Sequence, residues 1–249
     1  MGGVVAKAGA GMGGVLGRVN PDVWRELAYV SMSSYSFLLP KREEIVDRGD
    51  DGKLPVILIH GMGGNRGAWS PLRIFLRLHG HKRIYAFGYE EGGVEEIAPE
   101  FKRFIRSVLK ETKAQRVNIV AHSLGGLITR YVIQNMGMSR KVAALITLAT
   151  PHRGTFAAHW ANTVKTLQLR PQSEIIENLN SKNLTRYKIR FIALYSDRDV
   201  YVVPAEMMTH PDAENIFIPH ISHSQYLLSP EVFRCVAEHL AKIDRDFID

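Results

Sequence analysis

The chain of 249 residues contains a single cysteine, Cys235, so no disulfide can form within it. No combination of cysteine and histidine residues has the spacing of a structural zinc site, and no motif calls for a cofactor, so we expect neither a metal nor a cofactor. Cys235 continues the helical spacing of Val232, Val236 and Leu240. This pattern predicts a packed thiol rather than a reactive one.

A stretch with the features of a secretion signal is also missing. Residues 1–17 are rich in glycine, alanine and valine and carry one charge, Lys7, but they have no continuous apolar core followed by a cleavage site. Residues 22–39 have an amphipathic pattern, and Asp22, Arg25 and Glu26 argue against a membrane span. We expect residues 1–40 to form a tail and a helix that packs on the core, lines the site or touches a lipid surface peripherally. The expected location is the cytoplasm.

Aromatic residues are not interleaved with the positive charge, although the formal net charge is +7. A helix expected over residues 93–113 carries Arg103, Arg106, Lys110 and Lys113 opposite its apolar stripe. Without aromatic side chains or a known binding module, such a face is typical of a solvated helix. We therefore expect no nucleic-acid partner.

Apolar segments with strand and helix signals alternate along the rest of the chain. Nearly continuous apolar runs, which are typical of buried parallel strands, begin at residues 54, 82, 117, 141, 189 and 215, and a final helix is expected over 230–241. A hydrophobic content of 45% at this length fits one domain with a sizeable core. We predict an α/β fold with a mostly parallel sheet and helices on both faces. Residues 41–249 would form this single domain, with a small cap near 156–188.

Ser123 lies between one of these strands and a helix-like segment, in the stretch Ala121-His-Ser-Leu-Gly125. A sharp strand-to-helix turn needs small flanking residues, here Ala121 and Gly125, because a large side chain would collide as the chain reverses. This pattern is typical of a nucleophile elbow, which presents a serine hydroxyl above the sheet. The alternative is a serine that caps the helix N-terminus.

A glycine-rich turn follows the first strand at His60-Gly-Met-Gly-Gly64. Glycines let the backbone approach a developing oxyanion, and we assign the two donors to the N–H groups of Met62 and Leu124. A plain turn or a phosphate loop is the alternative. However, the Gly-Lys-Ser/Thr ending of a Walker loop is absent, and the spacing of a dinucleotide fingerprint is missed by one residue.

Two acids and two histidines follow the later strands. Asp199 lies beyond the strand that begins at residue 189 and is favoured over Asp197, which lies closer to the strand. His223 is favoured over His220 as a base, since His220 directly follows the strand at 215–219 and is better placed to orient the loop. A serine needs an imidazole to remove its proton and a carboxylate to hold the imidazole's tautomer. The order Ser123, Asp199, His223 is that of α/β-hydrolases.

Together His60–Gly64, Ala121–Gly126, Thr147–Thr155, Asp199 and His223 resemble the bacterial α/β-hydrolase lipases and esterases over residues 53 to 241. The resemblance implies an α/β-hydrolase fold and a serine carboxylic ester hydrolase acting on a small-molecule ester or an acylglycerol. It implies Ser123 as nucleophile, Asp199 and His223 as its partners, and Met62 and Leu124 as oxyanion donors. The same triad also serves acyltransferases and thioesterases, and some proteins of this fold only bind ligands.

The loop 149–155 follows a strand end, where open α/β sheets form their ligand crevice, so it should line the site. Its His152 is expected to be structural, turning the loop together with Pro151 and Gly154. The apolar residues between 156 and 188 predict short helices that either cover an acyl chain or pack in the core. The insertion between Thr155 and Ile189 is modest, so no large lid is expected.

Overall fold

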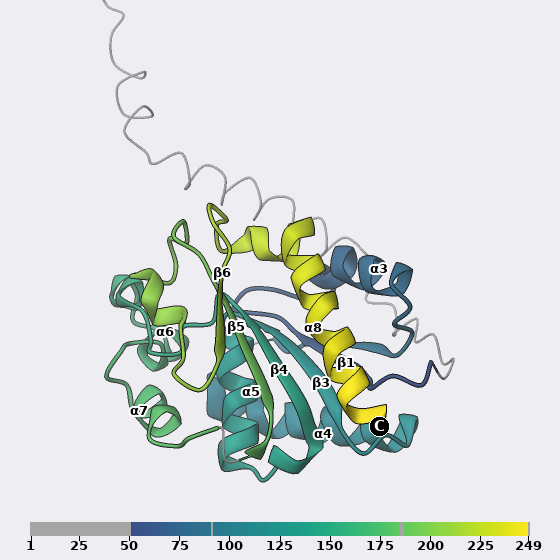
Figure 1. The fold of residues 1–249 in the computed structure, drawn as a ribbon. Coiled ribbons are helices and arrows are strands. Elements are labelled where there is room, and N and C mark those ends of the chain that lie inside the picture. Colours follow the sequence, from purple (N-terminus) through teal and green to yellow (C-terminus); the bar gives the residue numbers. More distant parts are fainter. Residues whose placement is uncertain (1–50, 91, 185–186, 249) are drawn as a thin grey trace, which may run out of the picture.

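The computed structural model describes residues 51–90, 92–184 and 187–248. Within these ranges one sheet of parallel strands has the order β2-β1-β3-β4-β5-β6 (Figure 1). The strands are β1 (Val56–Ile59), β2 (Ile84–Phe87), β3 (Val117–His122), β4 (Val142–Leu148), β5 (Arg190–Tyr195) and β6 (Glu214–Phe217). The six runs predicted from the sequence are confirmed as strands. The expectations for residues 1–40 lie outside the described residues.

Helices cover both faces of the sheet, as predicted. Helices α4 (Val94–Thr112) and α5 (Leu124–Asn135) pack on one face, and α3 (Ser70–Leu78) and α8 (Pro230–Ile248) pack on the other. Figure 1 shows α8 crossing one side of the sheet while α4 and α5 lie behind it. Strands β1 to β4 are fully buried because helices shield both of their faces, which explains their continuous apolar sequence.

Helix α4 has the two-sided character expected of its sequence. Phe101, Ile105 and Val108 are buried in the core, whereas the basic residues on the opposite side are exposed. The exposed basic residues are Arg103, Arg106, Lys110 and Lys113.

Helix α8 is longer than the predicted 230–241. Its apolar stripe continues through Leu240 to the buried Ile243, and Asp244 accepts a hydrogen bond from the N–H of Leu54 at 3.3 Å. Contacts with the first strand therefore extend the helix beyond the point where the sequence pattern weakens. Cys235 is half-buried on this helix, and burial raises the pKa of its thiol to about 11, which favours the inert thiol.

The cap region divides into an exposed half and a buried half. The short helices η3 (Phe156–Trp160) and α6 (Val164–Gln168) leave most of their large apolar side chains exposed. In contrast, α7 (Glu174–Asn180) buries Ile175, Ile176 and Leu179 against the α4 and α5 side of the core. Core packing is thus found for α7, whereas the covering of an acyl chain by the exposed half stays a prediction.

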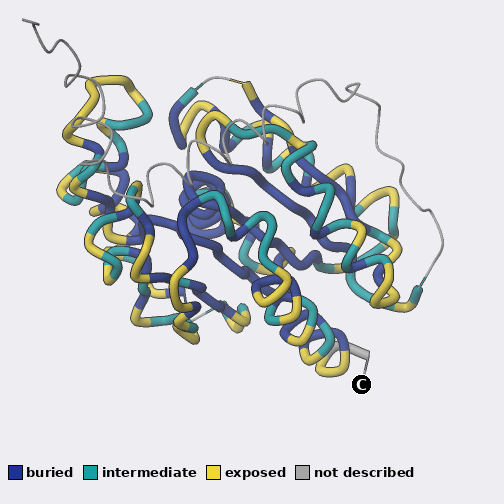
Figure 2. Tube along the Cα trace, turned by 90° about the horizontal axis from the view of Figure 1, so that it is seen from above, coloured by how far each residue is buried: buried dark blue, intermediate teal, exposed yellow. Residues whose placement is uncertain are grey.

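The remaining short helices are η1 (Arg66–Trp69), η2 (Ser139–Lys141), η5 (Ala205–Met208) and η6 (Ser224–Leu227). None of the helices in the described ranges is long and apolar enough to cross a membrane. Viewed along the sheet, the strands form a buried centre between helices whose outer turns are exposed (Figure 2).

The carboxyl ends of the parallel strands lie at one edge of the sheet. The register pairs Ile59 with Phe87 and Ala121, and Leu148 with Leu194. The loops that follow these strands contain the residues singled out in the sequence. A parallel sheet therefore gathers distant segments at the edge where such folds bind ligands.

Candidate active site

Ser123 occupies a strained turn between β3 and α5. Its φ of 51° and ψ of −123° are rarely adopted by residues other than glycine. The turn is held by the Ser123 N–H, which donates to Leu148 O at 2.9 Å, and by the Thr150 hydroxyl, which donates to Ser123 O at 3.0 Å. The Ser123 side chain makes no capping hydrogen bond to α5. The helix-cap alternative therefore does not account for this serine.

Glycines surround the elbow because there is no room for side chains. A Cβ on Gly125 would lie 2.6 Å from His60 O and 2.7 Å from Ile59 O. A Cβ on Gly61 would lie 2.7 Å from the Cβ of Ser123. The glycine-rich loop after β1 is thus packed directly against the serine.

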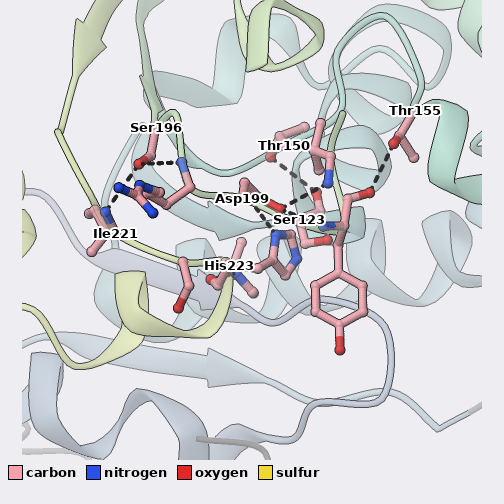
Figure 3. A network of polar contacts seen from close by, with 12 residues as sticks. Ser123, Thr150, Thr155, Ser196, Asp199, Ile221 and His223 are labelled. Carbon is pink, nitrogen blue, oxygen red and sulfur yellow. Dashed lines mark hydrogen bonds and ion pairs between the residues drawn. The ribbon is translucent and has the colours of Figure 1, made fainter. Parts of the chain in front are cut away.

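The second pair of residues, Asp199 and His223, is joined by a hydrogen bond of 2.7 Å between His223 Nδ1 and Asp199 Oδ2 (Figure 3). The other carboxylate oxygen accepts the N–H groups of Tyr201 and Val202, both at 2.8 Å. A carboxylate only accepts hydrogen bonds, so Nδ1 carries a proton, and in the neutral ring Nε2 has the lone pair. This is the tautomer that a general base requires.

The alternative pair, Asp197 and His220, lies apart from this arrangement. Asp197 Oδ1 accepts the backbone N–H of His220 at 2.9 Å, and its Oδ2 lies 3.3 Å from His220 Nδ1. The bond from the His220 N–H lowers the pKa of Asp197, and both side chains are largely exposed. This pair braces the histidine loop against the loop after β5.

His122 connects the serine turn to the histidine loop. Its ring Nε2 donates to the backbone oxygen of His223 at 3.0 Å, and the two ring centroids are 4.7 Å apart. Burial and the neighbouring His223 lower the pKa of His122 well below its usual value, so the ring is neutral. The histidine loop is also bonded to the loop after β5, because the Ile221 N–H donates to the Ser196 hydroxyl at 3.1 Å (Figure 3).

Two backbone N–H groups lie beside Ser123 as oxyanion candidates. Leu124 opens α5, so its N–H belongs to the positive end of that helix. Met62 lies in the glycine-rich loop whose Gly61 abuts Ser123. Within the described residues, no protein acceptor bonds to the N–H of Met62 or Leu124. The role of these two groups as oxyanion donors stays a prediction.

His152 is enclosed on the core side of its loop. Its Nε2 lies 3.0 Å from the Thr147 hydroxyl, and its backbone oxygen accepts from the buried Arg130 guanidinium at 3.2 Å. Arg130 also donates to Leu179 O and Asn180 Oδ1, which ties α5 to the cap helix α7. Burial, followed by Arg130, keeps the pKa of His152 well below its usual value. These contacts agree with the structural role predicted for His152.

The cap begins at Thr155, which is bound to the acid loop. The Thr155 hydroxyl donates to Tyr201 O at 2.9 Å and accepts from the Val203 N–H at 3.0 Å (Figure 3). The ring of Tyr201 lies 5.2 Å from that of His223 and is about half exposed. The first cap residues therefore flank the mouth of the site.

No group of three or more histidine, cysteine, aspartate or glutamate side chains with the geometry of a metal site occurs in residues 51–90, 92–184 and 187–248. The arrangement as described supports nucleophilic chemistry by the serine, with the histidine as base.

Solved structures identify the class of fold. The mature form of Bacillus licheniformis lipase BlEst2 aligns with a TM-score of 0.70 at 16% identity, covering 79% of this chain and 96% of that protein. Aspergillus fumigatus lipase B aligns with a TM-score of 0.69 at 16% identity, covering 80% of this chain and 55% of that protein. The fold is that of the α/β-hydrolases, as predicted.

The sequence then identifies the family. Residues 53–228 match the family Lipase (class 2), and the chain belongs to this family. A triacylglycerol lipase from Pseudarthrobacter phenanthrenivorans is 33% identical over 121 residues, 45% of this chain and 37% of that protein. Triacylglycerol lipase 2 from Saccharomyces cerevisiae is 25% identical over 163 residues, 64% of this chain and 44% of that protein. The chain thus spans less than half the length of these curated relatives.

Several residues that shape the site were not singled out from the sequence. Thr150 and Thr155 lie within the Thr-Pro-His-Arg-Gly-Thr stretch, and His122 lies within the elbow stretch. The sequence motifs therefore include these three residues but do not predict which groups they contact. Ser196 had no comparable signal. Its role depends on the approach of Ile221 from another loop.

Proposed function

We propose that this protein is a serine carboxylic ester hydrolase of the lipase and esterase type, with Ser123 as nucleophile, His223 as base and Asp199 as its partner. The observation that carries the proposal is the buried 2.7 Å bond between Asp199 and His223, in a loop tied through His122 to the strained turn of Ser123. The similarity to triacylglycerol lipases supports the same class of reaction.

Acylation begins when Ser123 Oγ attacks the ester carbonyl and His223 Nε2 takes the serine proton. Asp199 stabilises the imidazolium that forms. The imidazolium then gives its proton to the departing alcohol as the carbon–oxygen bond of the ester breaks. In deacylation a water attacks the acyl-enzyme, His223 accepts the water proton, and Ser123 recovers a proton as the acid leaves.

The developing oxyanion would be bound by the N–H groups of Met62 and Leu124. Each such donor contributes about 100- to 1,000-fold in kcat in serine hydrolases. The Leu124 N–H lies at the N-terminal, positive end of α5, which also favours a negative charge beside Ser123.

The natural substrate is proposed to be an ester with an apolar acyl chain, met at a lipid surface. Large apolar side chains are exposed on the glycine-rich loop, on the cap helices and on the acid loop, and we name this group the apolar rim: Met62, Phe156, Trp160, Val164, Leu167 and Tyr201. Trp160 is 83% exposed. The Phe156 N–H donates to Val203 O in the acid loop, and Met62 belongs to the oxyanion loop, so the rim adjoins the reacting groups. We propose that these side chains form one apolar patch, which is typical of membrane or partner contacts.

The catalytic proposal is tested with a fluorophosphonate probe and a p-nitrophenyl butyrate assay. Ser123→Ala should lose labelling and at least about 1,000-fold in kcat, because the nucleophile is removed. Ser107→Ala, which changes an exposed serine on α4, should retain both. Labelling of a different residue, or hydrolysis that survives in Ser123→Ala, would refute the assignment.

The lipid-surface proposal is tested with the double variant Trp160→Ser/Leu167→Ser. Hydrolysis of dissolved p-nitrophenyl butyrate should stay within about twofold, whereas hydrolysis of emulsified trioleoylglycerol should fall about tenfold or more, since each buried CH₂ contributes about 0.8 kcal/mol. Leu78→Ser is the matched control, because Leu78 is 81% exposed at the far end of α3. Equal losses on both substrates, or an equal loss in Leu78→Ser, would refute a lipid contact at the rim.

A further inference from the structure

His60 directly precedes the glycine-rich loop and is 1% exposed. Both of its ring nitrogens make hydrogen bonds to the described part of the chain. Nδ1 lies 2.8 Å from Gly61 O, and Nε2 lies 3.4 Å from the N–H of Tyr89. The Tyr89 ring stacks on the imidazole with centroids 4.2 Å apart and an angle of 13° between the planes.

These partners define the tautomer of His60. A carbonyl oxygen can only accept, so Nδ1 carries the proton, and Nε2 offers its lone pair to the Tyr89 N–H. Burial, then the positive charges of Arg66 and Lys165, lower the pKa of His60 to about 4. The ring is therefore neutral at pH 7 and keeps this single set of hydrogen bonds.

The hydrogen bond from Nδ1 controls the orientation of one peptide unit. Gly61 O and Met62 N–H belong to the same planar trans peptide, so they point in opposite directions. Gly61 O is held toward His60 by the ring and by the Gly64 N–H, which donates to it at 3.2 Å. The Met62 N–H must therefore point away from His60.

We propose that His60 is a positioning residue for ester hydrolysis, whose Nδ1–H fixes the Gly61–Met62 peptide so that the Met62 N–H stays aimed at the oxyanion. The proposal rests on the proposed function, since it assigns a positioning role in the same site to a further residue. Without the ring, Gly61 O loses the shorter of its two hydrogen bonds within the described chain, and Gly61 has no side chain to restrain the peptide from rotating. A rotated peptide would present a carbonyl oxygen to the oxyanion instead of a donor.

Tyr89 holds the ring in this position. In addition to the stacking, its hydroxyl donates to His60 O at 2.9 Å, and Tyr89 is itself buried. A Cβ on Gly125 would lie only 2.6 Å from the same carbonyl oxygen, so the His60 backbone is packed against the serine turn. His60 thus joins the loop after β1 and the loop after β2 through its ring, and it contacts the elbow through its backbone.

The test compares His60→Asn with His60→Gln. Asparagine carries its amide nitrogen on Cγ, as histidine carries Nδ1, so it can still donate to Gly61 O. Glutamine places its nitrogen one bond further out, at the position of Nε2. We expect His60→Gln to lower kcat for p-nitrophenyl butyrate about 10- to 100-fold with little change in KM, up to the effect of losing one oxyanion donor. His60→Asn should retain most of the activity.

A thiono ester separates positioning from a general loss of folded enzyme. In p-nitrophenyl thionobutyrate a sulfur replaces the carbonyl oxygen, and sulfur is a weak hydrogen-bond acceptor. The ratio of oxo-ester to thiono-ester hydrolysis does not depend on the fraction of folded protein. It should fall at least about fivefold in His60→Gln, recover in His60→Asn, and fall less in Tyr89→Phe.

An unchanged ratio in His60→Gln, or equal ratios in the Gln and Asn variants, would overturn the role of His60. Failure of the proposed function gives a different result, because the wild-type protein would then neither hydrolyse the oxo ester nor label with fluorophosphonate at Ser123. Hydrolysis and labelling of the wild-type protein are therefore measured before the variants are compared.

Discussion

His223 Nδ1 lies 2.7 Å from Asp199 Oδ2, and the Asp199 side chain has no solvent exposure. A buried carboxylate is stable only when its oxygens are paired, and here the remaining oxygen accepts the backbone N–H groups of Tyr201 and Val202. The acid loop thus supplies two backbone N–H donors to the Asp199 carboxylate beside the imidazole. Asp197 has no such enclosure, since its side chain is 42% exposed.

The enclosure of Asp199 leads to a prediction that separates the two acids. Asp199→Asn keeps the shape of the side chain but removes the charge and favours the wrong imidazole tautomer. We expect kcat for p-nitrophenyl butyrate to fall about 1,000- to 10,000-fold. Asp197→Asn is the matched control and should lose less than about fivefold, the scale of an exposed ion pair. Comparable losses in both variants would contradict the assignment of Asp199.

His122 provides a second prediction, because it ties the elbow to the histidine loop. His122→Leu removes the donor to His223 O, and the loop should relax by a fraction of an ångström. A displacement of this kind is expected to lower kcat about 10- to 100-fold. His122→Gln, which can place an amide donor near the position of Nε2, should restore part of the loss. Equal activity of the Leu and Gln variants, measured with active-site titration, would exclude the hydrogen bond as the cause.

Gly126 provides a third prediction, which concerns stability. A Cβ at this position would collide with the Thr150 side chain, whose hydroxyl holds Ser123 O. Gly126→Ala should lower the free energy of unfolding by about 1–3 kcal/mol and reduce activity as the elbow shifts. In the Gly126→Ala/Thr150→Ala double variant the two losses should be smaller than additive, because most of the colliding atoms are gone. Strict additivity in urea unfolding would show that the two side chains do not compete for this space.

The sequence predicted the structure best where a local feature of the chain restricts which residue types can occupy a position. Buried apolar runs placed the strands, and the small residues around Ser123 placed the turn, because a parallel sheet and a tight corner each restrict which residues fit. Asp199 and His223 were predicted together because a serine nucleophile needs a base and an acid partner, and because their order after Ser123 is that of α/β-hydrolases. The assignment of catalytic roles to these residues stays a prediction.

Other features depended on contacts between distant segments. Nothing near His60 in the sequence reveals that Tyr89 stacks on its ring from the next loop. The apolar residues of 156–188 look alike in sequence, yet Trp160 is exposed while Leu179 is buried, because α7 packs against α5. Helix α8 continues past residue 241 because Asp244 meets Leu54, which lies 190 positions earlier.

Buried histidines lead to a fourth prediction, on the effect of acid. Unfolded histidines gain a proton near pH 6.5. Burial lowers the pKa of His60, His81 and His210 to about 4, and it also lowers the pKa values of His122 and His152 well below their usual value. Between these values the unfolded chain binds more protons than the folded one. The free energy of unfolding should therefore fall as the pH decreases from about 7 to about 4.

Asp244 works in the opposite direction, since burial raises its pKa from 3.8 to about 6. Between these two values the folded state binds the extra proton, so acid adds stability through this one group. Five histidines outweigh one carboxyl, and the urea midpoint should be lower at pH 5 than at pH 7. The variant His210→Asn should reduce the slope of stability against pH by up to one proton, whereas His159→Asn, on the exposed surface of the cap, should leave it unchanged. A midpoint that rises on acidification would show that these histidines are protonated in the folded protein, and His60 Nε2 could then no longer accept the N–H of Tyr89.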